Sequence, residues 1–424
     1  MSAYRLTIIG SAIAGNKGAS AMLESAVQTL TERLGDVEFT LLSMYPAEDA
    51  AQNRFPNVAI VPANPRQLGV TINTLALAYR VLPPLRRLIR SRSRAVEALV
   101  GSQLLLDQGG ITFTDGREKF LLYNVASILP ALNVRTPVFK CAQAIGPFQN
   151  PVNRFASRTF LPKVRTIVTR GRITHDHAER LGLANLVAGA DYAFSLGLSG
   201  HERDEVAEHL DLAFFDGAPV VGISPSAVLQ KKVDARGGDY AGQIAIFVEQ
   251  LRSEGKRVLV LPHSARSGTD KTHNNDLPLC REIRSRLTST DDVLVVDREL
   301  SSQQLRYLIG RCDLFVASRF HAMVSSLAMA VPTLVIGWSH KYREVLEMFD
   351  LEEWAFGHDM LTPDHLRKRF ADLEECRDKV KAKLDEYLPA VKARSLEQAD
   401  LIAEAVRGIA AETADRRPAR SAAS

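Results

Sequence analysis

Short apolar runs alternate with longer segments of helical periodicity along most of this chain. The first run covers residues 6–9, and apolar residues then recur at helical spacing up to residue 34. Strands that alternate with helices in this way are typical of α/β units built on parallel sheets. Further strands are predicted in the first half of the chain at residues 37–42, 58–61, 104–106, 138–141 and 166–168.

A polar, charged stretch at residues 199–216 interrupts this alternation, which then starts again. Five more strands are predicted at residues 220–223, 258–261, 293–296, 314–316 and 333–336. The pattern therefore predicts an α/β fold of two Rossmann-like parallel-sheet domains that face a cleft. The predicted boundaries give an N-terminal domain at residues 1–200 and a C-terminal domain at residues 201–360.

The last part of the chain predicts helices without strands. Residues 361–411 are charged and carry apolar residues at helical spacing. Pro389 is expected to interrupt this segment, because proline lacks the N–H group that the helix needs. Residues 412–424 are expected to form a disordered tail. Earlier in the chain, Ser301 and Gln304 predict a capping box at the start of a helix.

Composition narrows the class of protein only moderately. The 424 residues suggest two or three domains, with 46% hydrophobic and 24% charged residues. The net charge of +4 is too small an excess to indicate a nucleic-acid partner. The four cysteines are far apart and form no CxxC pair, which fits a reducing cytoplasm better than a disulfide framework or a zinc site. The start of the chain is predicted as a strand and not as a signal peptide, and no apolar run is long enough to span a bilayer.

Residues 68–100 combine apolar and basic side chains. The apolar residues include Leu75, Leu77, Leu82, Leu85, Leu88 and Ile89, and the basic residues include Arg80, Arg86, Arg87, Arg90, Arg92 and Arg94. A basic amphipathic helix can lie on an anionic membrane. Pro83 and Pro84 would split such a helix in two, and a pair of core-facing helices with a solvated basic side is the favoured interpretation. Peripheral association with a membrane stays open as the alternative.

Two glycine-rich motifs follow predicted strands. Asn16, Lys17 and Gly18 belong to the motif GNKGAS, between the first strand and the first helix. Its glycines allow the backbone to approach a ligand, and the start of a helix offers N–H donors. A tight turn without a ligand explains this motif equally well. The second motif, DQGG at residues 107–110, favours a structural turn.

Three further candidates lie at strand exits. Gln143 belongs to AQAIGP, where a structural turn is the stronger interpretation. Arg170 follows the strand at residues 166–168, where an arginine can bind a phosphate or carboxylate through two hydrogen bonds, although a surface arginine is the commoner case. His263 follows the strand at residues 258–261 and is a candidate for a substrate contact. His175 and His177 form a His-x-His pair without partner ligands, which does not predict a metal site.

The sharpest motif is SRFH at residues 318–321. It places a guanidinium and an imidazole where a predicted strand gives way to a helix. Ligands of open parallel sheets bind in the crevice outside the carboxyl ends of the strands. The start of the helix adds free N–H groups and a partial positive charge. An anion is therefore the expected ligand of this motif.

In their order along the chain, these motifs resemble the polysaccharide pyruvyl transferase family. The resemblance covers residues 4–355 and rests on GNKGASAM, the Gly-Gly strand exit, AQAIGPF, Arg170, ISPS, VLPHS with Asn275-Asp276 downstream, SRFHA, and AVPTLVIGWSHKYRE with Lys341. It implies a fold like that of GT-B glycosyltransferases. It also implies transfer of a pyruvyl group from phosphoenolpyruvate, usually as a ketal, to a sugar of a cell-surface polysaccharide or of its lipid- or nucleotide-linked precursor.

The resemblance assigns roles by motif position. Arg319 and His321 match the catalytic pair and, with Phe320 and Arg170, the donor-binding residues. His321 is the expected acid/base, because its ordinary pKa lies near neutrality. The residues expected to contact the acceptor or to line the cleft are Asn16, Lys17, Gly18, Gln143, His263 and Lys341. The N-terminal domain is then the acceptor side and the C-terminal domain the donor side.

This chemistry requires no metal and no cofactor beyond phosphoenolpyruvate as the donor substrate. The expected partners are phosphoenolpyruvate and a sugar acceptor, in the cytoplasm or at the inner face of the membrane, and no oligomeric state is indicated. Two alternatives stay open on the same fold. One is a GT-B glycosyltransferase with a nucleotide-sugar donor, and the other is a non-catalytic carbohydrate-assembly protein.

Overall fold

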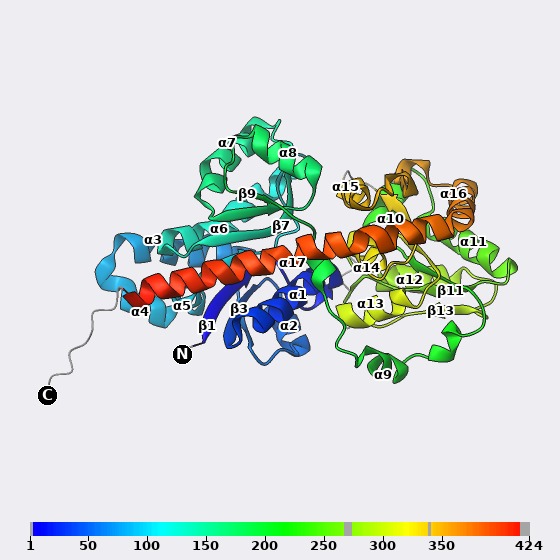
Figure 1. The fold of residues 1–424 in the computed structure, drawn as a ribbon, viewed down its shortest axis with the longest axis horizontal. Helices are drawn as coiled ribbons and strands as arrows, with labels where there is room; N and C mark the ends of the chain where they lie inside the picture. Colours follow the sequence, from blue (N-terminus) through cyan, green and yellow to red (C-terminus); the bar gives the residue numbers. More distant parts are fainter. Residues whose placement is uncertain (1–2, 267–273, 338–340, 416–424) are drawn as a thin grey trace. The chain divides into compact units, whose positions relative to one another are not determined.

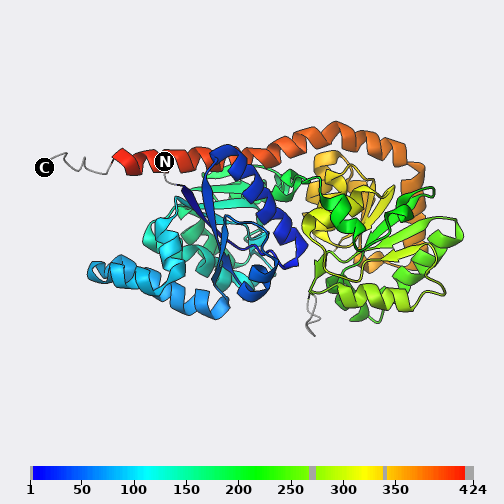
Figure 2. The ribbon, with the colours of Figure 1, turned by 90° about the horizontal axis from the view of Figure 1, so that it is seen from below.

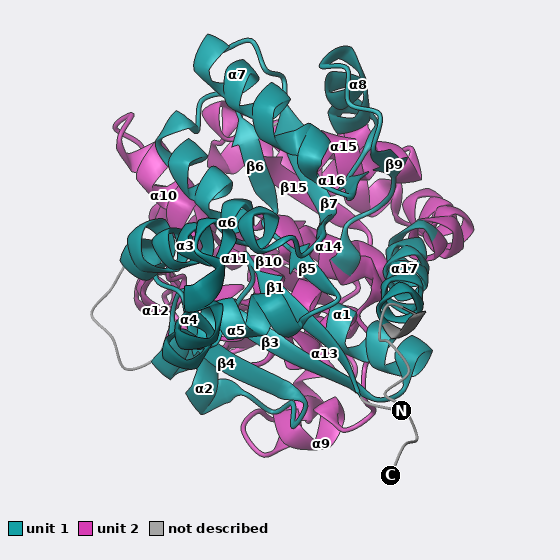
Figure 3. Cartoon of the chain, turned by 90° about the vertical axis from the view of Figure 1, so that its left-hand side faces the viewer, with its two compact units in different colours: residues 1–12, 26–192, 394–424 teal, residues 13–25, 193–393 magenta. Residues whose placement is uncertain are grey.

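The computed structural model describes residues 3–266, 274–337 and 341–415, seen from two sides in Figure 1 and Figure 2. The chain divides into two compact units, which Figure 3 colours separately. Unit 1 consists of residues 1–12, 26–192 and 394–424, and unit 2 consists of residues 13–25 and 193–393. The division at residue 193 lies close to the predicted boundary at residue 200. The strand pattern gave no indication that residues 13–25 belong to unit 2.

Unit 1 is built on a parallel sheet. Its strands are β1 (Tyr4–Ile9), β3 (Val37–Ser43), β4 (Val58–Pro62), β5 (Leu104–Asp107), β6 (Ile111–Thr114), β7 (Val138–Gly146), β8 (Thr166–Thr169) and β9 (Leu186–Ala188). Its helices include α2 (Pro46–Gln52), α3 (Asn73–Val81), α4 (Arg86–Arg92), α5 (Arg94–Gly101), α6 (Leu121–Val134), α7 (Pro151–Phe160) and α8 (Arg172–Arg180). The strand order is β4-β3-β1-β5-β7-β8-β9, with β6 paired to β7. The order runs outward from β1 in both directions, so the sheet is doubly wound.

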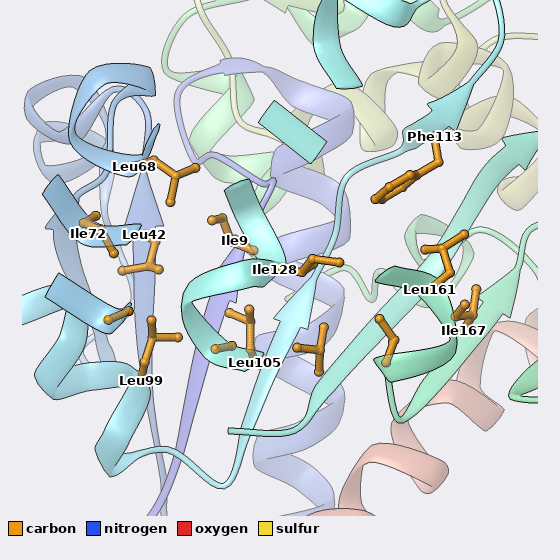
Figure 4. Close-up of a cluster of buried hydrophobic side chains, with 14 of the residues drawn as sticks. Ile9, Leu42, Leu68, Ile72, Leu99, Leu105, Phe113, Ile128, Leu161 and Ile167 are labelled. Atoms are coloured by element: carbon orange, nitrogen blue, oxygen red, sulfur yellow. The ribbon is translucent and has the colours of Figure 1, made fainter. Parts of the chain in front are cut away.

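Apolar strands buried on both faces hold unit 1 together. All nine residues of β7 are buried, as expected for a parallel strand covered by helices. Figure 4 shows the core on one side of the sheet. There Ile9 and Leu105 from the strands pack in one apolar cluster with Leu99 of α5 and Ile128 of α6. This packing fixes the positions of the strand ends.

Unit 2 is built on a second parallel sheet. Its strands are β10 (Val220–Ser224), β11 (Arg257–Val260), β13 (Val293–Val295), β14 (Leu314–Ala317), β15 (Thr333–Gly337) and β16 (Ala355–Gly357). Its helices include α9 (Glu202–Ala207), α10 (Ala227–Asp234), α11 (Tyr240–Ser253), α12 (Leu277–Ser285), α13 (Ser302–Gly310), α14 (Phe320–Ala328), α15 (Lys341–Leu346) and α16 (Pro363–Glu375). The strand order is β13-β11-β10-β14-β15-β16, so the direction of winding reverses between β10 and β14.

Two helices belong partly to each unit. Helix α1 (Lys17–Leu34) has residues 17–25 in unit 2 and the rest in unit 1. Helix α17 (Arg377–Asp415) has residues 377–393 in unit 2 and the rest in unit 1. Just before α1, the short strand β2 (Gly15–Asn16) pairs in antiparallel fashion with β12 (Ser264–Ala265). This pairing joins the first glycine motif to unit 2.

The predicted fold class of two Rossmann-like α/β domains is confirmed, and each predicted strand corresponds to a strand in the structure. The capping box is also confirmed, because the Ser301 hydroxyl accepts a hydrogen bond from the Gln304 N–H at 3.1 Å and the Gln304 side chain accepts one from Ser301 N–H at 2.9 Å. No described helix combines the length and the apolar character that a bilayer span needs.

Two expectations about the end of the chain are wrong. Pro389 lies inside the continuous helix α17, and the break comes at Cys376, between α16 and α17. The buried side chains of Val380, Leu384 and Val391 on both sides of the proline hold the helix in place, which offsets the lost hydrogen bond. Residues 412–415, expected to belong to a disordered tail, instead form the last turn of α17. Residues 416–424 lie outside the described part.

A buried ion pair in unit 1 provides a test of the fold. Lys140 of β7 donates to Asp107 at the end of β5, and both side chains are fully buried. We expect Lys140→Met to lower the free energy of unfolding by about 3–5 kcal/mol, because it leaves a buried carboxylate without its cation. The exposed pair of Arg5 and Glu38 is the control, and Arg5→Met is expected to cost less than about 1 kcal/mol. Equal losses in denaturant titrations would contradict this assignment.

Candidate functional site

The reversal of strand order in unit 2 places the ends of β10 and β14 side by side. Ser224 is the last residue of β10, and its carbonyl accepts a hydrogen bond from the Ser318 N–H at 3.0 Å. The Ser318 hydroxyl is in turn hydrogen-bonded to the Tyr240 hydroxyl at 2.8 Å, deep in the unit. Such a switch point is where open parallel sheets bind ligands. The SRFH motif therefore starts at the expected position for a binding site.

Helix α14 begins directly at this switch point. Arg319 is its N-cap residue with extended backbone, and Phe320 and His321 are its first two residues. The first N–H groups of a helix have no partner within the helix and carry a partial positive charge. The imidazole of His321 therefore lies on the turn that attracts an anion.

The guanidinium of Arg319 is held by two described partners. Its Nε donates to Asp276 Oδ2 at 2.8 Å, its Nη2 donates to Asp276 Oδ1, and its Nη1 donates to Asn274 Oδ1 at 2.7 Å. Asp276 also accepts the backbone N–H groups of Ala227 and Ser264, both at 2.9 Å. This fully buried carboxylate therefore ties Arg319 to the start of α10 and to β12. Three of the five N–H groups of Arg319 are used in this way.

Gly18 lies against the imidazole of His321. A Cβ atom on Gly18 would come within 2.0 Å of His321 Nδ1 and 2.2 Å of its Cγ, so no other residue fits without moving the imidazole. The Gly18 N–H donates to the Asn16 side chain at 3.1 Å, and the Lys17 N–H donates to the His263 carbonyl at 3.3 Å. The first glycine motif and the SRFH motif, about 300 positions apart, therefore meet within unit 2.

Two buried polar contacts fasten the segment of residues 13–25 to unit 2. The ammonium of Lys17 lies 2.8 Å from Glu299, which also accepts the Gly15 N–H at 3.1 Å. Glu24, which is 2% exposed, accepts hydrogen bonds from Ser302 at 2.5 Å and from Gln303 at 2.9 Å. Lys17, a candidate acceptor contact, thus also has a structural role.

His263 is a second imidazole in this region. It follows β11, and it is almost completely buried. Burial lowers the pKa of His263 well below its usual range, and the nearby positive charges of His321 and Arg319 act in the same direction. Among the described residues, no group forms a hydrogen bond with its Nε2 atom. His263 is therefore a neutral imidazole at neutral pH.

Lys341 and Phe320 form an adjoining cluster. The Lys341 ammonium lies 4.7 Å from the centroid of the Phe320 ring and 5.2 Å from that of the Tyr342 ring. These two rings pack edge to face at 5.6 Å. An ammonium over aromatic rings is stabilised by their negative faces. Trp338, Ser339 and His340, which precede Lys341 in the sequence motif, lie outside the described residues.

The other two predicted residues belong to unit 1. Arg170 follows β8, is 1% exposed, and donates from Nη1 to Asp191 Oδ2 at 3.2 Å. Gln143 is fully buried in β7, where its amide accepts from Thr112 at 2.6 Å and donates to the Asp107 carbonyl at 2.7 Å. The Arg170 N–H donates to the Gln143 carbonyl at 3.1 Å. Arg170, which follows β8, is therefore a neighbour of Gln143 within β7.

The structure thus brings most of the predicted site residues together in one unit. The residues in unit 2 are Asn16, Lys17, Gly18, His263, Arg319, Phe320, His321 and Lys341. Asp276 and Glu24 were not predicted as part of the site, because their partners are distant in the chain. The downstream Asn-Asp of the family motif was the available signal for Asp276. Within the described ranges, no group of three His, Cys, Asp or Glu residues could hold a metal ion.

Comparison with known proteins adds independent information. The family model described as polysaccharide pyruvyl transferase matches residues 16–340. The amylovoran biosynthesis protein AmsJ of Erwinia amylovora is 21% identical over 378 residues, which cover 83% of this chain and 87% of that protein.

Solved structures of other proteins have a fold similar to that of this chain. A UDP-GlcNAc 2-epimerase from Neisseria meningitidis, solved with UDP-GlcNAc bound, superposes with a TM-score of 0.62 at 11% identity, covering 96% of this chain and all of that one. An α,α-trehalose 6-phosphate synthase from Burkholderia multivorans superposes with a TM-score of 0.51 at 13% identity, covering 99% of both chains. These likenesses establish a GT-B-type fold.

The buried His263 predicts how stability depends on pH. Its pKa is lower in the folded protein than the value of about 6.5 expected after unfolding, so unfolding takes up a proton below that pH. The free energy of unfolding should therefore fall as the pH drops from 7 to 5, by up to about 1.4 kcal/mol per pH unit from this group. His263→Gln should flatten this dependence, whereas His209→Gln, at an exposed position, should preserve it. Parallel profiles for wild type and His263→Gln would disprove the assignment.

Proposed function

We propose, because the chain belongs to the polysaccharide pyruvyl transferase family, that it transfers the pyruvyl group of phosphoenolpyruvate to a sugar as a ketal. The family makes the protein a transferase of polysaccharide biosynthesis, and the similarity to the amylovoran biosynthesis protein supports that role. The proposed acceptor is a sugar of a cell-surface polysaccharide or of its lipid- or nucleotide-linked precursor.

One observation carries this proposal: His321 and the fixed guanidinium of Arg319 share the N-terminal turn of α14 at the switch point of unit 2. Phosphoenolpyruvate carries a phosphate and a carboxylate on a three-carbon frame, and its charge requires cationic or N–H partners when it leaves water. A helix N-terminus and an arginine supply both. Two N–H groups of Arg319 form no hydrogen bond with any described residue, and we assign these to the donor.

The proposed reaction begins with a proton transfer. His321, as the general acid, delivers a proton to the methylene carbon of phosphoenolpyruvate, and the neighbouring carbon becomes electrophilic. One sugar hydroxyl attacks that carbon and gives up its proton, which restores the protonated imidazole. The carbon–oxygen bond to phosphate then breaks, a second sugar hydroxyl closes the ketal, and the phosphate leaves with the second hydroxyl proton. Two hydroxyl groups and one enol phosphate thus give one ketal and one phosphate.

The surroundings of His321 suit this role. Gly18 limits the positions that the imidazole can take, because the backbone of the first glycine motif lies directly against it. Asp276 holds Arg319 through two hydrogen bonds, so little reorganisation is needed when charge develops on the departing phosphate. His263 stays neutral and therefore adds no positive charge to the proposed donor site.

The remaining assignments follow the family pattern. Arg170 is proposed as a second donor contact, with Asp191 holding its side chain. Asn16, Lys17 and Lys341 are proposed as contacts to the acceptor or to its carrier. Gln143, whose amide is used within unit 1, is proposed to act by supporting Arg170 through its carbonyl.

We expect His321→Ala to lower turnover by roughly 10²–10⁴-fold, because it removes the proposed acid/base. The measurement is phosphate release from phosphoenolpyruvate in the presence of the acceptor. His209→Ala, which removes an exposed imidazole of the same unit, should keep wild-type turnover. Wild-type turnover in a folded His321→Ala variant would remove this residue from the mechanism.

A ligand screen separates this function from a nucleotide-sugar transferase. A ligand that binds the native state raises the melting temperature by mass action. Phosphoenolpyruvate should stabilise the wild-type protein, and the stabilisation should shrink in Arg170→Ala, where a proposed donor contact is lost. Stabilisation by nucleotide sugars with no response to phosphoenolpyruvate would favour the glycosyltransferase alternative.

A further inference from the structure

The helical region of residues 67–94 in unit 1 exposes large apolar side chains. After the turn at Gln67–Ile72 come α3, a proline-containing turn at Pro83–Leu85 and α4, drawn in light blue in Figure 2. Six large apolar residues of this region are solvent-exposed, at 42–67% of their surface: Val70, Leu77, Val81, Leu82, Leu85 and Leu88. These exposed residues far outnumber those on any other segment of comparable length in the described chain. We call them the apolar ridge.

The opposite side of these helices is packed in the usual way. Ile72, Ala76 and Ile89 are buried and belong to the apolar core of unit 1. The core contacts of these helices are therefore made by other residues, and the exposed leucines are not part of the core of unit 1. The favoured interpretation of the sequence, core-facing helices with a solvated basic side, described only one of the two faces.

The ridge lies within a strongly basic segment. Its arginines are Arg66, Arg80, Arg86, Arg87, Arg90, Arg92 and Arg94, and no Asp or Glu occurs between Asp49 and Glu97. Only Arg90 among these arginines forms an ion pair with a described residue, with Glu97 at 2.6 Å. Arg86 bonds the Tyr79 carbonyl and lies over its ring, 5.1 Å from the centroid. The segment thus keeps most of its positive charge.

We propose that the apolar ridge and its arginines form a docking surface for an anionic lipid membrane. Leucine and valine side chains insert into the boundary between head groups and acyl chains, while arginines bind lipid phosphates. The phosphates of a nucleic acid would bind the same arginines, but they would not account for six exposed aliphatic side chains. An acidic protein partner would satisfy both features, and the test below separates it. The proposal does not depend on the pyruvyl chemistry, although it would bring the enzyme to a lipid-linked sugar.

The two prolines suit this geometry. Pro83 and Pro84 end α3 and begin the turn before α4, and both are exposed together with Leu82 and Leu85. The apolar ridge therefore lies on a bent pair of short helices, and its residues Leu82 and Leu85 are at the bend. A bent pair of this kind can insert its corner to a shallow depth, whereas no described helix is long and apolar enough to span the bilayer.

The test is flotation of the full-length protein with vesicles. Vesicles of phosphatidylcholine containing one third phosphatidylglycerol should carry the protein upward at 0.1 M salt, and vesicles of pure phosphatidylcholine should carry much less. Binding should weaken at 0.5 M salt, because the charges are then screened over a few ångströms. Arg86→Glu/Arg87→Glu should lower the partition coefficient at least roughly tenfold.

Two further variants make the test specific. Leu85→Ser/Leu88→Ser should lower binding at unchanged charge, because the apolar contribution scales with buried area. Arg180→Glu/Arg203→Glu, at exposed positions of α8 and α9, makes the same change in net charge and should leave flotation near the wild-type level. Melting temperatures check that each variant is folded.

Three outcomes would overturn the proposal. The first is no flotation with anionic vesicles. The second is an equal loss of binding in Arg180→Glu/Arg203→Glu, which would make the attraction one of net charge alone. The third is a wild-type protein that does not bind vesicles but self-associates, while the Leu85→Ser/Leu88→Ser variant does not self-associate. That result would assign the apolar ridge to a contact between two copies of the chain.

Discussion

The contact between the backbone of Gly18 and the imidazole of His321 is the constraint on which the candidate site depends. A methyl group at position 18 would overlap His321 Nδ1 at 2.0 Å, so the loop and the imidazole fix each other. Residues 13–25 follow the first strand of unit 1 but belong to unit 2, so Gly18 and His321 lie in the same unit. The start of α14 therefore lies against a backbone segment about 300 positions earlier in the sequence.

Buried polar groups hold this arrangement in place. Asp276 accepts four hydrogen bonds from Arg319 and two backbone N–H groups, and Glu24 accepts from the first residues of α13. Leaving either carboxylate buried without these donors would be costly, so each network forms as a whole or not at all. Such fixed donors are what the proposed electrostatic stabilisation of a departing phosphate requires.

The sequence predicts the strands and the switch-point motif because both have local signatures. Apolar runs such as residues 314–316 are visible in the sequence itself. The position of SRFH directly after such a run can be recognised without knowing where the rest of the chain lies. The fact that residues 13–25 belong to unit 2 has no such local signature in the sequence. It depends on a two-residue strand pairing and on Glu24 meeting Ser302, 278 positions away. Pro389 shows the reverse case, in which buried side chains on both sides outweigh a strong local signal.

Turnover of the Gly18→Ala variant tests the central claim most directly. The measurement is phosphate release from phosphoenolpyruvate below the melting temperatures of all proteins compared, with Gly408→Ala as the control, since a Cβ there meets no atom within 4 Å. The account predicts a loss of at least about 100-fold for Gly18→Ala, because the displaced imidazole no longer serves as the acid/base. It predicts wild-type turnover for Gly408→Ala. A folded Gly18→Ala protein with wild-type turnover would contradict it.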